Sequence, residues 1–318
     1  MSDAKFSSVF GRPVNISYML NNPPPPIDFV LPGLTAGSVG TLIGPGGMGK
    51  TMLELQVAVL LATGLGQYDP LFGPATFDGL PMAPQKVVLV VAEEHVNVLW
   101  HRVHAIVRSL DQRHVLPEDL SWPEFEQLLD QNLSMYPLAG ARRVNLLTPD
   151  LTPSEDAHEL AALSQGARLL IVDPLRQLHF EDENQSAPMS ALMSVFKQVA
   201  QQSGAAVLVA HHSSRAASLQ GYGDTADAGR GSTALKDDAR WQINLVPPTR
   251  EVLDAYGLPA NQASAHVVLA DAKNNYDSKR APVLLRRTAG GVLVPVQPVA
   301  VAGVSANKKP GLFKKAVA

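Results

Sequence analysis

The chain has 318 residues and a mass of 33.9 kDa, and 46% of its residues are hydrophobic. This suffices for one large α/β domain or two small ones with a sizeable core. A formal charge of −3 and a pI near 6.3 exclude whole-molecule attraction to nucleic acid, so any such contact must come from local basic loops. The absence of cysteine excludes disulfides and thiolate metal sites, and no apolar run reaches the ~18 residues that span a membrane, so we expect a cytoplasmic location without membrane contact.

The two ends of the chain differ from the middle. Residues 1–26 lack regular periodicity and end in four prolines, which favour an extended polyproline II conformation. We therefore interpret 1–26 as an extended proline-rich arm and 27–298 as the folded domain. Residues 299–318 contain four lysines and are expected to form a mobile basic tail.

Residues 44–51 read GPGGMGKT and match the pattern Gly-x4-Gly-Lys-Thr. Glycines let successive backbone N–H groups point at phosphate oxygens, and the following helix brings its positive end to the same place. We expect Lys50 to neutralise the β- and γ-phosphates of a nucleoside triphosphate, and the Thr51 hydroxyl to bind Mg²⁺. A glycine-rich loop that merely carries a lysine is the alternative, and the strand before and helix after the motif argue against it. The other residues expected to enclose the phosphates are Gly44, Pro45, Gly46, Gly47, Met48 and Gly49.

Apolar runs typical of strands alternate with helical patterns through the first two thirds of the chain. This alternation predicts an α/β fold in which helices cover both faces of a mostly parallel sheet. The expected strands are 39–43, 86–92, 169–172 and 206–210, and the expected helices are 52–62, 96–110 and 191–200. Beyond Arg240, the apolar runs suggest antiparallel strands added at one edge of the sheet: 241–246, 265–270, 283–285 and 291–296. We expect long loops, which more often carry function than not, at 64–84, 181–188 and 213–230.

Acidic residues and histidines follow three of the predicted strands. Asp173 ends the apolar run 169–172 and is a candidate to hold Mg²⁺ through water, although Asp-Pro is itself a turn signal. Glu93 follows 86–92 and is well placed to orient the attacking water, whereas Glu94 is expected to open the next helix. Both acids could instead simply belong to that helix's first turn.

Two histidines and a glycine-rich loop follow the strand at 206–210. Either His211 or His212 could hydrogen-bond the γ-phosphate and couple nucleotide state to the loop that follows. That loop carries Arg215 and Arg230 and is a candidate DNA-contacting element, effective when several copies act together. The local sequence around Arg240 favours an ordinary salt bridge to Asp237 or Asp238.

Taken together, these motifs make the chain resemble the plasmid-encoded RepA replicative helicases, which are small homohexameric RecA-like ATPases. The resemblance runs from about residue 23 to about residue 294. It depends on the phosphate loop and on a set of less common strings: PPPIDFVLP, AEE with a downstream HRVH, DPLRQLHFEDEN, HHSS, RGST with RWQ, and AKNNY.

The resemblance implies a ring of six subunits around single-stranded DNA, with ATP and Mg²⁺ bound between neighbours and 5′-to-3′ unwinding in plasmid replication, together with other plasmid replication proteins as partners. It implies that Glu93 is the catalytic carboxylate and that Asp173 is the aspartate on the metal side. It also implies a histidine sensor of the γ-phosphate, for which His212 is preferred to His211. Arg240 becomes an arginine finger for the adjacent subunit, which replaces the salt-bridge interpretation. The loops 181–188 and 213–230 would line the central channel, and the arm would pack on a neighbour.

The sequence departs from the helicase pattern at two places. Larger replicative helicases carry Lys-x-Arg on a late strand, whereas this chain has Lys273-Asn274-Asn275, so Lys273 alone remains to reach a neighbour's γ-phosphate. Arg215 stands where the plasmid helicases are expected to have lysine.

Two other classes of protein share parts of this pattern. A RecA-like recombination or regulatory ATPase would bind DNA without unwinding it, but the chain offers little room for the extra domains that such recombinases usually carry. A nucleotide switch for guanine would need Asn-Lys-x-Asp, and the nearest string, at 307–310, ends in proline. We therefore expect an ATP-driven helicase.

Overall fold

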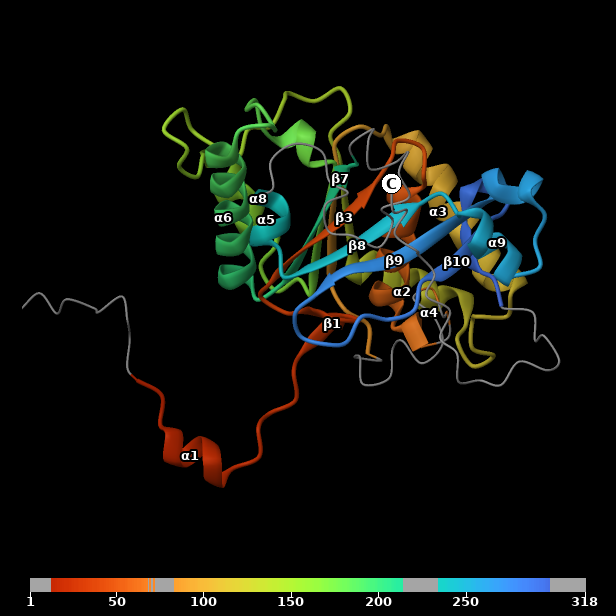
Figure 1. The fold of residues 1–318 in the computed structure, drawn as a ribbon, viewed down its shortest axis with the longest axis horizontal. Helices are drawn as coiled ribbons and strands as arrows, with labels where there is room; N and C mark the ends of the chain where they lie inside the picture. The colour runs from red at the N-terminus through yellow and green to blue at the C-terminus, as the bar shows by residue number, and fades with distance from the viewer. Residues whose placement is uncertain (1–12, 68, 70, 72–82, 214–233, 298–318) are drawn as a thin grey trace, which may run out of the picture.

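A nine-stranded mixed sheet forms the centre of the molecule (Figure 1). The computed structural model describes residues 13–67, 69, 71, 83–213 and 234–297. Six neighbouring strands are parallel and the last three are antiparallel, which gives the order β11-β10-β9-β8-β3-β7-β6-β4-β5. The strands are β3 (Val39–Gly44), β4 (Val87–Val91), β5 (Leu133–Pro137), β6 (Leu169–Asp173), β7 (Ala206–His212), β8 (Trp241–Val246), β9 (His266–Asn274), β10 (Val283–Arg287) and β11 (Leu293–Pro295).

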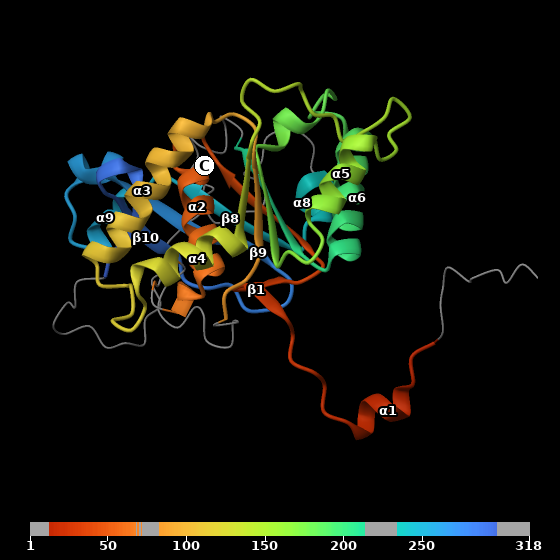
Figure 2. The same ribbon diagram turned by 180° about the vertical axis from the view of Figure 1, so that it is seen from behind.

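Helices cover both faces of the sheet, as the alternating sequence pattern predicts (Figures 1 and 2). One apolar core lies under α2 (Lys50–Thr63), α3 (Val96–Gln112) and α4 (Trp122–Asn132). The core on the other face lies under α5 (Glu155–Leu163), α6 (Ser186–Ser203) and α8 (Ala234–Asp238). A small third cluster holds α9 (Arg250–Ala255) against β9 and β10. The central strands β3, β4, β6 and β7 are buried almost throughout, which explains their continuous apolar runs.

The parallel register brings the carboxyl ends of four strands to one edge of the sheet. β3 pairs with β7, β7 with β6, and β6 with β4, all in parallel. The segments that follow β3, β4, β6 and β7 therefore meet at this edge, where ligands bind in open α/β sheets. A functional site is expected there.

The N-terminal segment stands apart from the body of the molecule (Figures 1 and 2). It contains one short helix, α1 (Ile16–Asn21), whose N-cap Asn15 accepts a hydrogen bond from the Tyr18 N–H at 3.0 Å. No residue of α1 is buried, and the exposed side chains include Ile16, Tyr18 and Leu20. After the prolines, β1 (Phe29–Leu31) and β2 (Leu34–Thr35) form a separate two-stranded sheet that leads into β3.

The structure differs from the sequence-based expectations in several elements. β8 is parallel to β3, so the antiparallel addition starts at β9 and not at 241. The predicted loop 181–188 is shorter than expected because α6 already begins at Ser186. The helices α1, α4, α5, α8 and α9 and the strands β1, β2 and β5 were not expected. β5 lies at the sheet edge and is only half-buried, so it lacks the continuous apolar run by which its neighbours are recognised.

Candidate functional site: a nucleotide cleft

The loop between β3 and α2 has the backbone that phosphate binding needs. Gly47 and Gly49 have φ angles of 75° and 96°, which side chains other than glycine adopt only with strain. A Cβ atom built on Gly46 or Gly47 would meet nothing within 4 Å, so this side of the loop is open. Gly49 caps the N-terminus of α2, whose first N–H groups therefore face the same opening.

Lys50 folds back over this loop. Its Nζ donates hydrogen bonds to the carbonyl oxygens of Gly44 at 2.9 Å and Pro45 at 3.2 Å, and lies 3.4 Å from His212 Nδ1. Burial lowers the pKa of Lys50, and the carboxylates of Asp173, Glu54 and Glu93 oppose this shift. The Lys50 amine is thus a largely buried cation at the phosphate loop, where it can bind an anion.

Thr51 and Asp173 meet directly at the base of the cleft. The Thr51 hydroxyl donates to Asp173 Oδ2 at 2.5 Å, and Asp173 ends β6 with only 5% of its surface exposed. Asp173 therefore does more than begin a turn before Pro174. A hydroxyl and a carboxylate in contact beside a phosphate loop are oxygen ligands of the kind that Mg²⁺ prefers, so these residues fit the metal.

Both glutamates after β4 line a cleft of about 340 Å³ together with the phosphate loop. Glu93 accepts a hydrogen bond from Gln177 Nε2 at 3.1 Å, and Glu94 forms an ion pair with Arg102. α3 begins only at Val96, so neither acid lies in its first turn. The expectations that Glu94 opens the helix and that both acids belong to its first turn are therefore wrong, because His95 is the N-cap and α3 starts at Val96.

The two histidines that end β7 face different surroundings. His212 lines the nucleotide cleft beside Lys50. His211 is 1% exposed, and its Nδ1 lies 3.8 Å from Glu183 Oε1 in the segment between β6 and α6. The alternation of side chains along a strand produces this division. Of the two, His212 is the residue positioned to contact a bound phosphate.

Arg240 and Lys273 lie at the opposite end of the sheet from the chain's own phosphate loop. The register pairs Gly40 with Trp241, and Gln242 with Lys273, near the start of β3. The Arg240 N–H donates to the Val39 carbonyl at 3.3 Å, and the five residue steps along β3 from Val39 to Gly44 correspond to about 16 Å. The side chain of Arg240 is exposed and forms no ion pair with Asp237 or Asp238 in the described part of the chain, so the salt-bridge interpretation is wrong. Asp238 pairs with Lys197 instead.

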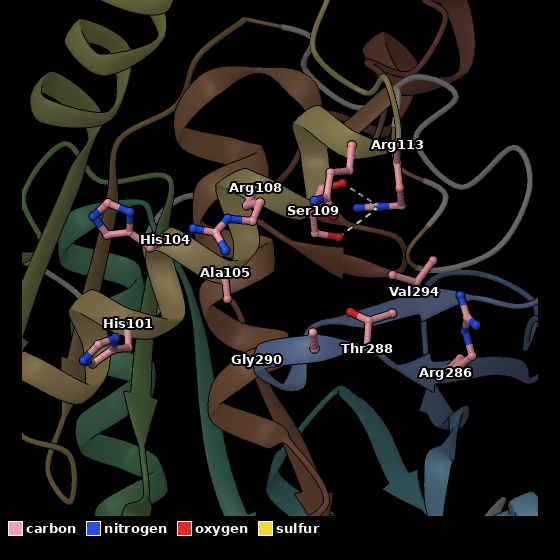
Figure 3. Close-up of a pocket in the computed structure, with 12 residues that line it drawn as sticks. His101, His104, Ala105, Arg108, Ser109, Arg113, Arg286, Thr288, Gly290 and Val294 are labelled. Carbon is pink, nitrogen blue, oxygen red and sulfur yellow. Dashed lines mark hydrogen bonds between the residues drawn. The ribbon is translucent and has the colours of Figure 1, made fainter.

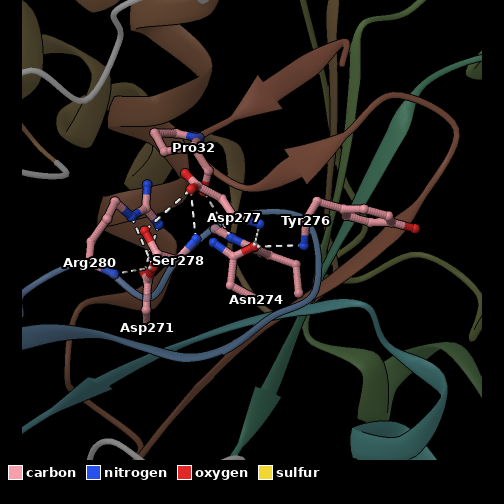
Figure 4. A network of polar contacts seen from close by, with 8 residues as sticks. Pro32, Asp271, Asn274, Tyr276, Asp277, Ser278 and Arg280 are labelled. Atoms are coloured by element: carbon pink, nitrogen blue, oxygen red, sulfur yellow. Dashed lines mark hydrogen bonds and ion pairs between the residues drawn. The ribbon is translucent and has the colours of Figure 1, made fainter. Parts of the chain in front are cut away.

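The chain after Lys273 is held by a polar network (Figure 4). Asn274 Oδ1 accepts the backbone N–H groups of Tyr276 at 3.3 Å and Asp277 at 3.1 Å. Arg280 binds Asp271 through Nε at 2.9 Å and Nη2 at 2.6 Å. The end of β9 therefore has a defined conformation, and its Lys273 lies opposite Gln242 near the start of β8, with Nζ donating to the Asp237 carbonyl at 3.3 Å.

Sequence reasoning did not single out Arg287, which lines the cleft, or Glu54, which is buried and interacts with Asp173, and two of its candidates lie outside the described chain. Arg287 lines the cleft from β10, over Met48, and burial lowers its pKa. Glu54 is fully buried one helical turn after Lys50, and burial followed by the charge of Asp173 raises its pKa well above the usual range. A charged residue at i+4 from the loop lysine was a visible signal, whereas nothing in the sequence marks Arg287. Arg215 and Arg230 lie outside the described residues.

The sheet order, the glycine-rich loop and the residues at the ends of β4, β6 and β7 are those of an α/β fold of the P-loop nucleotide-binding class. The model of the family described as AAA domain (AAA_25) matches residues 12–218, about two thirds of the chain. The chain belongs to this family.

Two solved structures resemble the fold. The first, titled "ATPase Domain of G40P", aligns with a TM-score of 0.51 and 17% identity over 82% of this chain and 85% of that one. The second, titled "Crystal structure of the RadB recombinase", aligns with a TM-score of 0.48 and 16% identity over 83% of this chain and 93% of that one. Among the described residues, no helix has the length and apolarity needed to cross a membrane.

Proposed function

We propose that this protein is an ATP-dependent DNA helicase that works as a homohexameric ring on single-stranded DNA. The observation that carries the proposal is the position of Arg240 and Lys273, which both lie at the end of the sheet remote from the chain's own phosphate loop. Neither cation reaches its own cleft, which leaves a neighbouring subunit's cleft as the site of action. ATP would then bind between subunits, as in rings and filaments of ATPases.

Each residue of the cleft has a role in this proposal. Lys50 and the loop N–H groups bind the β- and γ-phosphates, and Glu93, fixed by Gln177, orients the attacking water. Thr51 and Asp173 would hold Mg²⁺, which supplies charge neutralisation at the phosphates. The guanidinium of a neighbour's Arg240 stabilises the charge that develops in the transition state.

His212 connects the nucleotide to the segment that follows β7. Loss of the γ-phosphate would release its contact with His212 and bias that segment between two positions. Repeated around a ring, this bias would move the segments 181–188 and 213–230, with Arg215 and Arg230, along the DNA strand. The 5′-to-3′ direction, the plasmid context and the packing of the N-terminal arm on a neighbour come from the family resemblance.

A mixing experiment tests the shared site. Arg240→Ala and Lys50→Ala are each expected to lower DNA-stimulated ATP hydrolysis by about 10³-fold, and Arg240→Ala should retain ATP binding. In a mixed ring, an Arg240→Ala subunit still has Lys50 in its own cleft, and a neighbouring Lys50→Ala subunit still supplies Arg240. Such interfaces are complete, so mixing the two variants should restore part of the activity. Arg250→Ala, which removes an exposed arginine elsewhere, is the control. Full activity of Arg240→Ala alone, or no recovery on mixing, contradicts the shared site.

A RecA-like recombination or regulatory ATPase that binds DNA without unwinding is the second candidate, because the same fold and cleft serve it. Unwinding of forked DNA with ATP separates the two. Strand separation by the wild type and its loss in Arg240→Ala support the helicase, whereas DNA-stimulated hydrolysis without strand separation supports the alternative.

A further inference from the structure

The chain between β6 and α6 contacts the ends of both strands that flank β6 in the sheet. We call residues 174–185 the β6–α6 segment. On one side of it, Gln177 Nε2 donates to Glu93 Oε1, after β4, at 3.1 Å. On the other side, Glu183 Oε1 lies 3.8 Å from His211 Nδ1, near the end of β7. One short segment therefore touches both the candidate catalytic carboxylate and a strand that ends at the nucleotide cleft.

Glu183 presents its carboxylate to two buried imidazoles. Its Oε1 lies 3.9 Å from His179 Nε2 as well as 3.8 Å from His211 Nδ1. The side chains of His179 and His211 are 0% and 1% exposed, and that of Glu183 is 11% exposed. Within the part of the chain that the structure describes, no group of three histidine or acidic side chains has the arrangement of a metal site. We therefore interpret the three side chains as a hydrogen-bonding cluster.

The two distances are slightly too long for hydrogen bonds. Glu183 Oε1 is buried and has no hydrogen-bond partner among the described residues, and a buried acceptor without a donor is costly. A shift of about 1 Å would bring the N–H of either imidazole into range. A neutral histidine can supply this N–H, so neither interaction requires a charged imidazole. A small movement is therefore enough to give Glu183 a partner.

The two histidines lie on different elements. His179 belongs to the β6–α6 segment, and its carbonyl oxygen accepts a hydrogen bond from Arg143 Nη2 at 2.9 Å. A hydrogen bond from His179 to Glu183 would stay within the segment, whereas one from His211 would join the segment to β7. His211 directly precedes His212, which lines the nucleotide cleft. A ligand that moves His212 therefore also moves the backbone of His211.

We infer that Glu183 is a positioning residue that couples nucleotide binding at His212 to the catalytic carboxylate Glu93. With a γ-phosphate in the cleft, β7 shifts and His211 donates a hydrogen bond to Glu183. This bond fixes the β6–α6 segment, and with it Gln177, so that Glu93 is held in place to orient the attacking water. The inference rests on the proposed ATP hydrolysis, but it requires neither a ring nor unwinding.

Steady-state ATP hydrolysis by the full chain without DNA separates positioning from binding. Glu183→Ala should lower kcat about 10-fold, the usual effect of losing one hydrogen bond, and leave the KM for ATP nearly unchanged. Glu183→Gln keeps an acceptor oxygen and should retain most of the wild-type kcat. Glu118→Ala, which removes an exposed glutamate elsewhere, is the control and should behave as the wild type. Rates are compared at a temperature at which thermal unfolding shows every variant to be folded. An equal loss of kcat in the alanine and glutamine variants would overturn the inference.

A double-mutant cycle tests whether Glu183 acts through His211. His211→Leu removes the donor and should lower kcat by an amount similar to Glu183→Ala. Because both substitutions break the same interaction, the double variant should lose no more than either single variant. Losses that multiply in the double variant would mean that the two residues act independently, and this would overturn the inference.

Phe180 offers a site for a direct reporter of the segment. Its side chain is 53% exposed, and the Arg143 guanidinium lies 4.3 Å from the centre of its ring, so movement of the segment changes the surroundings of this ring. Phe180→Trp is introduced after the other exposed tryptophans, Trp100 and Trp122, have been replaced by phenylalanine. A non-hydrolysable ATP analogue should change the fluorescence of this protein. Adding Glu183→Ala should abolish the change while calorimetry shows unaltered affinity for the analogue.

The fluorescence experiment does not depend on hydrolysis, so the two proposals can fail separately. Absence of ATP hydrolysis by the wild type would contradict the proposed function and leave the fluorescence test valid. A nucleotide-induced signal that persists in Glu183→Ala would overturn the coupling, even in an active helicase. Binding of the analogue without any fluorescence change in the Phe180→Trp protein would also overturn it.

Discussion

At the scale of single residues, the cleft depends on charges that are buried before any nucleotide arrives. Lys50 is 6% exposed and is held by carbonyl oxygens, and Arg287 enters the same cleft with no carboxylate partner in the described part of the chain. Such groups are costly to bury alone and are stabilised by an anionic ligand. A bound triphosphate would supply this compensation.

Arg287→Ala is therefore expected to weaken ATP binding by about 10- to 150-fold, because one charge-assisted contact to phosphate contributes roughly 1.5–3 kcal/mol. Arg250→Ala is the control, since it removes an exposed arginine that does not line the cleft. Affinity is measured by calorimetry with a non-hydrolysable ATP analogue. Equal weakening by the two substitutions would show that Arg287 acts only through the general charge of the protein.

His179 gives the molecule a pH dependence below neutrality. Burial, followed by the charges of Arg176, His211 and Arg143, lowers the pKa of His179 from 6.5 to about 4. Between pH 6.5 and 4, His179 is therefore protonated in the unfolded chain but not in the folded chain. The contribution of His179 to stability is complete above pH 6.5 and falls as the pH is lowered through this window. This shift in the pKa of His179 lowers the free energy of unfolding by about 2–3 kcal/mol at pH 4 relative to neutral pH.

Denaturant unfolding at pH 7 and pH 4.5 tests this expectation. His179→Gln should lose less stability than the wild type between the two pH values, because the substituted side chain does not take up a proton. His158→Gln changes an exposed histidine and should behave as the wild type. The same pH dependence in all three proteins would mean that other groups dominate acid unfolding.

At the scale of elements, α3 and the turn between β10 and β11 approach closely at one point beside the nucleotide cleft (Figure 3). Gln56 on α2 fixes this turn by exchanging two hydrogen bonds, of 2.9 and 2.8 Å, with the backbone of Leu293. Gly290 then meets Ala105 with no room for a side chain. The helix that carries the phosphate loop and the edge of the sheet are thereby tied together.

Gly290→Ala should destabilise the protein by more than Gly166→Ala. Both glycines have positive φ, 75° and 70°, so both substitutions carry the cost of about 1 kcal/mol for a left-handed backbone. Only Gly290 adds a collision, with Ala105, which typically costs a further 1–3 kcal/mol, whereas a Cβ on Gly166 meets nothing within 4 Å. Equal losses on thermal and denaturant unfolding would mean that α3 moves away without cost.

At the scale of the whole molecule, the body is complete without the N-terminal segment. α1 contributes no buried residue, yet it exposes a series of apolar side chains: Val14, Ile16, Tyr18, Met19 and Leu20. A contiguous apolar segment that covers nothing in its own subunit is suited to a surface on another copy.

Deletion of residues 1–26 is expected to leave the unfolding midpoint of the core nearly unchanged and to lower the population of the ring. Native mass spectrometry with and without an ATP analogue measures the assembly, and thermal unfolding below the association concentration measures the core. A ring that forms equally well without the arm would remove its proposed role, and a persistent monomer of the full chain would remove the intersubunit roles of Arg240 and Lys273.

The sequence by itself determined the local features of this protein. The phosphate loop, the parallel core strands and the acids at their ends follow from short-range patterns, because glycine spacing and hydrophobic period act within a few residues. The half-buried edge strand β5 and the parallel pairing of β8 with β3 were not expected. The placement of Arg287 in the cleft, and of Arg240 and Lys273 at the far end of the sheet, was decided by the tertiary structure alone. Strand order and register bring together residues that are far apart in the chain, and no local pattern encodes those long-range pairings.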